Sequence, residues 1–179
     1  DNCVTSMGSR LLRHSLHHPL RQRDIPATRH GAVDSLLDEY GRMAGEVRRE
    51  LKGIADIERI AGRIALRNAR PRDLASLRES LGRLGTLRRP IVGTASPLLA
   101  ELDIQLETPH AALDLLTRAI AAEPSAQIRD GGAIATGYDA ELDELRSLND
   151  NCGAYLVEME VRERERSGIA SLKVEYNKV

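Results

Sequence analysis

The sequence predicts a mainly α-helical fold, in which a multi-helix domain carries one long helix that leads into a short β-strand. Aromatic residues make up only 2% of the chain, against 41% hydrophobic residues overall, so the core must consist of leucine, isoleucine, valine and alanine. Such a core suits interlocking helices better than sheets, which are enriched in aromatic and β-branched residues. Apolar residues also recur at helical spacing between prolines and glycines along most of the chain.

Three helices are predicted before residue 54. Thr5 or Ser6 can cap the first and Pro19 ends it. The second helix is expected over residues 25–39, and a short third helix over 41–53. The apolar face of the first helix comprises Met7, Leu11, Leu12 and Leu16. The second is expected to turn Ala32, Val33, Leu36 and Leu37 inward, and the third to use Met43, Val47 and Leu51.

A helical hairpin is predicted next. Asp56 is a suitable N-cap, Arg70-Pro71 breaks the first helix, and Pro71 fits the first turn of the second. The connection between the two helices is therefore very short. The stripe of the first helix follows the i, i+3, i+4 spacing of an amphipathic helix, and its members are Ile57, Ile60, Ala61, Ile64 and Ala65. The second presents Leu74, Leu77, Leu81 and Leu84.

Beyond the hairpin, residues 90–97 should form a loop. Short helices are expected over 97–105 and 109–121. The segment 124–132 is predicted to be irregular, with a brief strand at 127–129.

A long helix is predicted from Tyr138 to Arg166, ending at Gly168. About 29 residues at 1.5 Å each make a rod of about 43 Å. The pairs Glu158–Arg162 and Glu160–Arg164 should support its last turns. Apolar residues spaced 4-3-4-3 indicate a helix that packs lengthwise on another helix. We call these residues the seam: Tyr138, Leu142, Leu145, Cys152, Leu156 and Met159, with Asn149 among them or with Leu148 in its place if the stripe rotates.

Catalytic chemistry is not indicated anywhere in the chain. No nucleophile–base pattern is recognisable, and the carboxylates at the start of the long helix complement its dipole rather than forming a catalytic pair. His14, His17 and His18 share a helix face, but no nearby carboxylate or thiol completes a metal site and flanking arginines repel cations. We therefore expect no catalytic, metal or cofactor-binding residue. Cys3 and Cys152 are expected to be reduced.

Candidate DNA contacts are few, because a net charge of −1 lacks the basic excess of a dedicated nucleic-acid-binding domain. Arg10 and Arg13 belong to a basic stretch that is a phosphate-binding patch, a solvated face or an interface to domains outside this chain. Lys173 and Lys178 lie on the terminal strand-like segment and are either DNA contacts or solvent-facing residues. Gly131 and Gly132 could cradle a phosphate, but the P-loop pattern is absent, which favours a structural turn.

Three motifs in collinear order resemble the core, or lever, region of the bacterial DNA mismatch repair family MutS. One is IRDGGAIATGYDAELDELR, followed by RERERSGIASLKVEYNKV. The others are CVTSMGSRLLRHSLHHPLRQR near the start and DIERIAGRIALRNARPRDLASLRESL in the middle. One departure from the family pattern is Ser15, which occupies a position where the family usually carries tryptophan.

The resemblance implies a helical lever over residues 1–166 and the beginning of a DNA clamp over 167–179. It also implies that the complete protein is a cytoplasmic, nucleoid-associated homodimer that binds mismatched double-stranded DNA and works with a MutL-type partner. ATP and Mg would bind in a separate P-loop domain, and the main DNA contacts would lie further out in the clamp. The lever itself would have no catalytic site and would link nucleotide state to clamp closure.

Two alternatives to this interpretation remain open. One is the core of a MutS paralogue that works outside mismatch repair. The other is a stand-alone helical module that binds a protein partner, although an unpaired terminal strand edge argues against it. The chain begins without methionine and ends within the alternating LKVEYNKV, so we expect a piece of a longer protein. No segment approaches the length of an apolar membrane span or a signal peptide.

Overall fold

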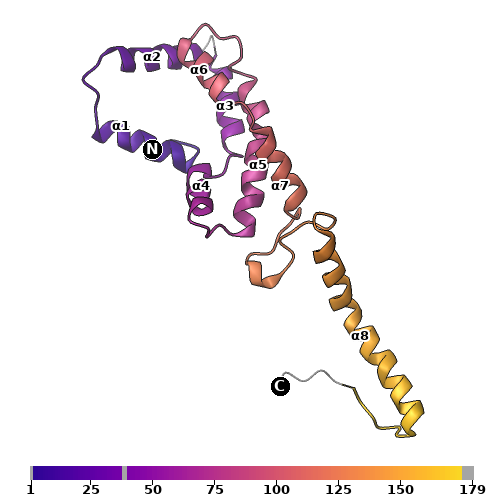
Figure 1. Ribbon diagram of the computed structural model, residues 1–179. Helices are drawn as coiled ribbons and strands as arrows, with labels where there is room; N and C mark the ends of the chain where they lie inside the picture. The colour runs from indigo at the N-terminus through magenta and orange to yellow at the C-terminus, as the bar shows by residue number, and fades with distance from the viewer. Residues whose placement is uncertain (1, 38–39, 175–179) are drawn as a thin grey trace. The chain divides into compact units, whose positions relative to one another are not determined.

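The computed structural model describes residues 2–37 and 40–174, and within them the chain is mainly α-helical (Figure 1). Residues 1–135 and 136–179 form two separate compact units. The predicted terminal strand falls partly beyond residue 174, and residues 172–174 are irregular. The helices are α1 (Ser6–His17), α2 (Asp24–Leu36), α3 (Arg42–Leu51), α4 (Ile57–Ala65), α5 (Pro71–Arg88), α6 (Pro97–Gln105), α7 (His110–Ala119), the 3-10 helix η1 (Ile128–Asp130) and α8 (Ala140–Ser167).

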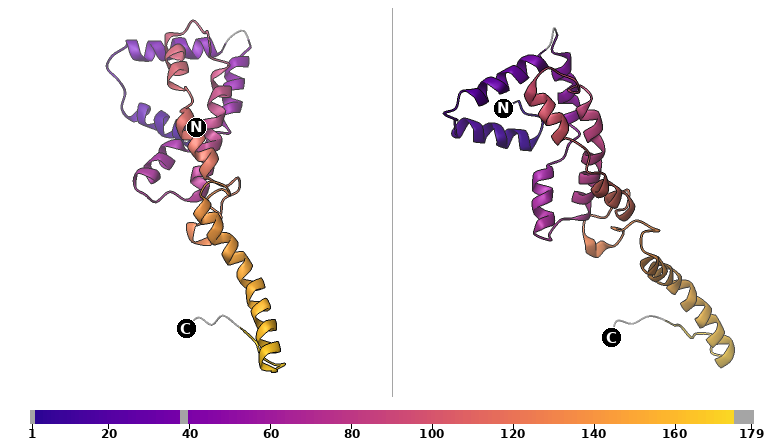
Figure 2. Two further views of the ribbon diagram at one scale, coloured as in Figure 1. Left: turned by 45° about the vertical axis from the view of Figure 1, so that its right-hand side comes forward. Right: turned by 45° about the horizontal axis from the view of Figure 1, so that its top comes forward.

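Helix α5 is the centre of the first unit, because α3, α4 and α7 all pack against it (Figure 2). Pro71 occupies its first turn, where the missing N–H costs no hydrogen bond. Its buried leucines form one core cluster together with half-buried side chains from α3, from α7 and from Leu106. The buried members are Leu81, Leu84 and Leu87. This leucine-rich packing is the core that the low aromatic content predicts.

A buried serine joins the loop before α4 to α5. The Ser80 hydroxyl donates to the carbonyl of Ser76 at 2.7 Å and accepts a hydrogen bond from the backbone N–H of Ala55 at 2.9 Å. Ser80 is fully buried. The hydroxyl therefore satisfies a loop N–H that would otherwise have no partner at this position.

We expect Ser80→Ala to lower the free energy of unfolding by about 1–3 kcal/mol, because the Ala55 N–H would lose its acceptor in a buried setting. Urea denaturation followed by circular dichroism measures this change. Ser35→Ala is the matched control, since Ser35 makes the same bond to the carbonyl four residues earlier and accepts none from another described segment. The control should change stability by less than about 0.5 kcal/mol. Equal effects of the two variants would contradict the role given to Ser80.

Arg78 joins α5 to the segment that follows α7. Its guanidinium donates to the carbonyls of Ile120 at 2.7 Å, Ala121 at 3.2 Å and Ala122 at 3.1 Å. An isolated antiparallel bridge then pairs Ile120 with Ile134. The brief strand predicted at 127–129 is wrong, because residues 128–130 form the 3-10 helix η1.

The first two helices leave much apolar surface uncovered. Thr5 caps α1 as predicted, accepting from the N–H of Gly8, yet α1 has no buried residue. In α2, Ala32 is buried while Val33 is 51% exposed, and Leu37 at its C-cap is 59% exposed. The prediction that all four apolar residues turn inward is therefore wrong. Periodicity identifies an apolar stripe but does not say how much of it another element covers.

The second unit consists of α8 and the residues around it. Asp139 caps the helix by accepting from the N–H of Leu142, and Gly168 ends it in the left-handed conformation. The pairs Glu158–Arg162 and Glu160–Arg164 are both present, as predicted. The helix contains 28 residues and lies within two residues of its predicted ends.

The chain that follows α8 is held to its last turns by a polar clasp. The Arg164 Nε donates to the carbonyl of Leu172 at 2.8 Å, and the N–H of Val174 donates to Glu160 Oε2 at 3.0 Å. Because Arg164 and Glu160 also pair with each other, one ion pair serves both the helix and the returning segment.

Candidate functional site

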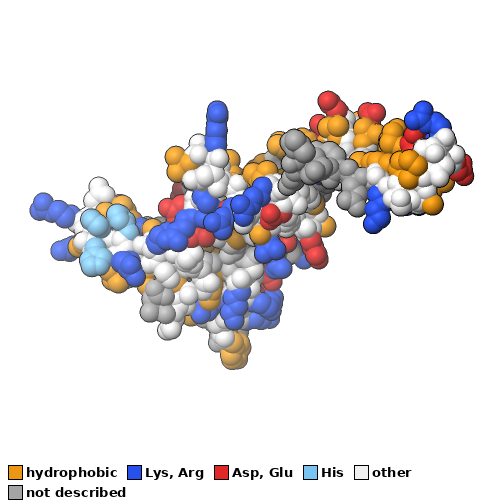
Figure 3. Space-filling view, turned by 90° about the horizontal axis from the view of Figure 1, so that it is seen from below, with side chains coloured by type: hydrophobic (Ala, Val, Ile, Leu, Met, Phe, Trp, Pro, Cys, Tyr) orange, Lys and Arg blue, Asp and Glu red, His pale blue; other side chains and the backbone are white. Residues whose placement is uncertain are grey.

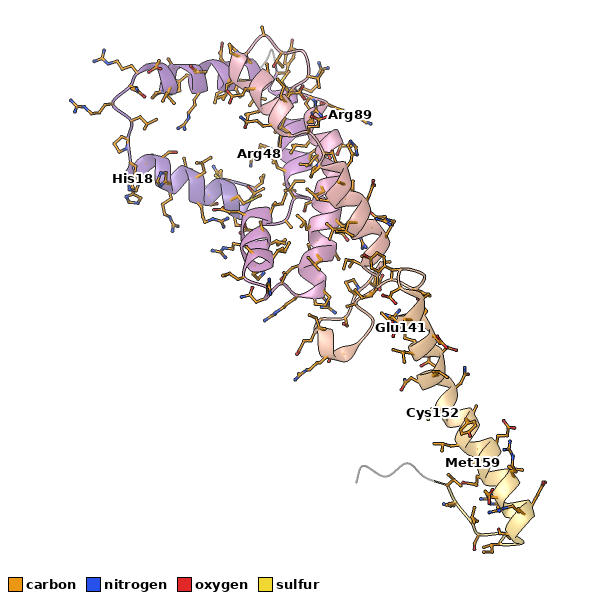
Figure 4. The ribbon with its side chains drawn as sticks, viewed as in Figure 1. His18, Arg48, Arg89, Glu141, Cys152 and Met159 are labelled. Carbon is orange, nitrogen blue, oxygen red and sulfur yellow. The ribbon has the colours of Figure 1, made fainter. Side chains whose placement is uncertain are left out.

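The seam on α8 is an exposed to half-buried stripe in this structure. Tyr138, which lies just before the N-cap of α8, is 43% exposed. Leu145 is 57% and Met159 is 37% exposed, and no residue of α8 is buried. Figure 4 shows Cys152 and Met159 on the same helix. Asn149 and the off-seam Leu148 are exposed as well, so burial does not distinguish the two registers that the sequence leaves open. Packing of the seam on another helix stays a prediction.

Arg10, a predicted DNA contact, forms a bidentate ion pair within the chain. Its Nη1 and Nη2 atoms each donate to an Asp56 carboxylate oxygen at 2.7 Å, and Nη2 also bonds Glu58. These hydrogen bonds hold the pKa of the Asp56 carboxyl well below its usual range and raise the pKa of Arg10. Asp56 also caps α4 by accepting from the N–H of Arg59. Arg10 therefore ties α1 to the start of α4 in this structure.

We expect this ion pair to make part of the stability depend on acid pH. A carboxyl whose pKa is lowered by folding stabilises the fold above its unfolded pKa of about 3.9, and this contribution is lost as pH falls further. Asp56→Asn keeps a capping oxygen but removes the charge. The difference in melting temperature between wild type and this variant should be constant above about pH 5 and shrink below about pH 4.

Asp56→Ala is the companion variant, because it removes the cap as well as the charge. It should cost about 1 kcal/mol more than Asp56→Asn in the free energy of unfolding at neutral pH. A melting-temperature difference between wild type and Asp56→Asn that stays the same down to pH 3 would show that the ion pair contributes nothing to acid sensitivity.

The other predicted DNA contacts are placed differently. Arg13 and Lys173 are both exposed, and no hydrogen bond or ion pair engages either side chain within residues 2–37 and 40–174. Lys178 lies outside the described residues. Arg13 belongs to the first unit and Lys173 to the second, so the structure does not define one basic surface that contains both.

Figure 3 shows histidine side chains next to basic side chains on one part of the surface. The rings of His14 and His18 stack with centroids 4.4 Å apart, and His18 Nδ1 lies 3.1 Å from the carbonyl oxygen of His14. Across the described part of the chain, no three histidine, cysteine or acidic side chains come together in a metal-binding group. Cys3 and Cys152 are both exposed, and no disulfide joins them.

Gly131 and Gly132 adopt φ angles of +73° and +67°. These angles lie in the left-handed region that side chains with a Cβ rarely adopt, which is the physical reason for glycine at both positions. The turn follows η1 directly and precedes the bridge at Ile134. Its geometry serves the reversal of the chain.

Sequence reasoning missed two features of these surfaces. It treated Arg10 as a free cation, although Asp56 and Glu58 form a local acidic signal at the start of α4. It also treated Glu160 and Arg164 only as a helix-stabilising pair, although both bond the segment that follows the helix. Neither long-range bond has a signature in residue spacing.

Comparison with protein families identifies the family to which this chain belongs. The family model described as MutS domain III matches residues 1–171, which is most of the chain. In the region that the structure describes, no helix combines the length and apolar character needed to cross a membrane. The match agrees with the helical architecture and with the three motifs noted in the sequence. The chain belongs to the MutS family of DNA mismatch repair proteins, as its domain III.

Proposed function

We propose that this domain is the mechanical connector of a MutS-type mismatch repair protein, linking an ATP-binding domain to a DNA clamp. Membership of the family supports a role in the core of such a protein. A non-catalytic helical domain of this family suits a mechanical task.

Helix α8 is the observation that carries this proposal. Its 28 residues span about 42 Å at 1.5 Å each. Asp139 and Gly168 cap its two ends, while its seam remains open for a packing partner. A continuous capped helix transmits displacement along its axis better than a chain with loops. Coupling between distant sites requires such an element, provided that it has two arrangements and that both sites bias the choice.

The remaining features of the proposal concern the complete protein. ATP and Mg would bind in the P-loop domain, and mismatched duplex DNA would be recognised by other domains and held by the clamp. The complete protein would act as a homodimer, together with a MutL-type partner, in the bacterial cytoplasm at the nucleoid. This domain would contribute no catalytic residue to that cycle.

Fluorescence anisotropy of labelled matched and G·T-mismatched duplexes, titrated with this chain at low and moderate salt, tests the division of labour. We expect no preference for the mismatch. Weak binding that is equal for both duplexes and falls with salt would be consistent with a phosphate contact. Arg13→Gln and Lys173→Gln would then be the first variants to compare, because both side chains are exposed. Preferential binding of the mismatch would refute the proposal, because recognition would then lie in the connector itself.

A further inference from the structure

A basic hollow lies between the α4–α5 turn and η1, both within the first unit. Its volume is about 510 Å³. Arginine side chains from two separate segments line it, Arg67 and Arg70 from the turn and Arg129 from η1. Asn68 and Gln127 add amide groups to the same lining. The hollow shares no residue with the α8 seam or with the Arg10 ion pair.

The charges of this hollow are largely uncompensated. None of the lining residues is acidic. The nearby Asp73 is already engaged, since it accepts from Arg63 at 2.7 Å and from the backbone N–H of Arg70 at 2.9 Å. Asp130 lies 3.8 Å from its neighbour Arg129, and both side chains are exposed, so the pair is weak. Within the described residues no carboxylate forms an ion pair with Arg67 or Arg70.

Two of these arginines lie at constrained backbone positions. Arg67 has a φ of +55°, and no other non-glycine residue in the described segments has a positive φ. A left-handed conformation costs about 1 kcal/mol or more for a residue with a Cβ. Arg70 is extended, as required before a proline, and directly precedes the 18-residue helix α5. The positive end of that helix dipole adds to the field of the three guanidinium groups.

We propose that Arg67, Arg70 and Arg129 form a binding site for a phosphate group, of the kind carried by a nucleotide or by a nucleic acid backbone. The planar guanidinium offers paired donors that match phosphate oxygens, and it keeps its charge at all physiological pH values. Three arginine residues line this hollow and no lining residue is acidic, so the local positive charge favours a bound anion. This site does not depend on the connector role of α8, so either proposal can fail alone.

Titration of the ¹⁵N-labelled chain with pyrophosphate, observed through the arginine Nε–H resonances, tests the site. We expect saturable shifts of the Arg67, Arg70 and Arg129 signals. Arg67→Gln and Arg129→Gln should each weaken binding about tenfold, because each removes a charge-assisted contact. Arg118→Gln on α7 is the control, since Arg118 is also exposed but lies outside the hollow. Arg129→Gln alone decides the matter if the Arg67 variant fails to fold.

Competition experiments separate the two sources of the phosphate. Displacement of pyrophosphate by metal-free ATP, but not by a short duplex, identifies a nucleotide site. Displacement by the duplex, with a steep dependence on salt, identifies a backbone contact. The absence of any shift at millimolar pyrophosphate would overturn the proposal. Equal shifts at Arg118 and in the hollow would overturn it too, because they would show nonspecific attraction to exposed arginines.

Discussion

Replacement of Leu84 by alanine should destabilise the first unit by about 3 kcal/mol, within the range of 2–5 kcal/mol typical of buried leucines. Leu84 is 7% exposed and belongs to the cluster where side chains of α3, α5 and α7 meet. The loss combines the transfer free energy of the removed methyl groups with the cavity that they leave. With so few aromatic residues, the core has no large neighbouring ring that could fill this space. Urea denaturation at neutral pH measures the change.

Leu115→Ala provides the control for this prediction, since Leu115 lies on α7 but is 48% exposed. It should cost well under about 1 kcal/mol, because removing half-exposed methyl groups opens no cavity. A cost for Leu84→Ala as small as that of Leu115→Ala would mean that the cluster is not a close-packed core. The helices would then be held together mainly by polar contacts such as those of Ser80 and Arg78.

The second large effect is expected in the complete protein. Leu145→Ser combined with Leu156→Ser should leave ATP hydrolysis intact but reduce the ATP-induced change in DNA release by about tenfold or more, because coupling between sites is typically worth 5- to 150-fold. Both residues belong to the seam, and among the described residues Leu145 is exposed and Leu156 is half-buried. In the 179-residue chain itself, we therefore expect only a small change in the free energy of unfolding.

Leu148→Ser combined with Val157→Ser is the matched control. These residues are 63% and 65% exposed and lie beside the seam on the same helix. Stopped-flow measurement of DNA dissociation with and without ATP compares the two double variants. Full nucleotide-dependent release in a folded Leu145→Ser, Leu156→Ser protein would refute the connector proposal. Loss of coupling in the Leu148 variant instead would show that the packing stripe is rotated by one residue from the seam as defined here.

Much of the fold can be predicted from the sequence because local signals mark the helix ends. Asp56 caps α4, Pro71 begins α5 and Gly168 ends α8, all as expected. Each signal acts through a hydrogen bond or a backbone angle within a few residues. The strand predicted at 127–129 is wrong because that prediction also used only local residues. A short β-prone run carries no information about whether a partner strand exists.

The candidate site was predicted less well, because its contacts join residues far apart in the chain. Arg10 donates to Asp56, which lies 46 positions further along the chain. Arg129 lines the same hollow as Arg67 and Arg70, although it is far from both in sequence. A basic stretch in a sequence indicates charge but not whether a carboxylate will meet it. The seam is the opposite case, since its spacing is visible in the sequence while the helix that would pack against it is not.

The clasp at the end of α8 constrains rotation as well as translation. Glu160 and Arg164 lie one turn apart on the same stripe of the helix, and between them they bond Leu172 and Val174. The returning segment is thereby fixed to one angular position around the helix axis. A twist of α8 would swing that segment through an arc, whereas a free loop would absorb the twist. A rotation of α8 about its own axis would therefore displace Leu172 and Val174 sideways, because both are bonded to side chains of the helix.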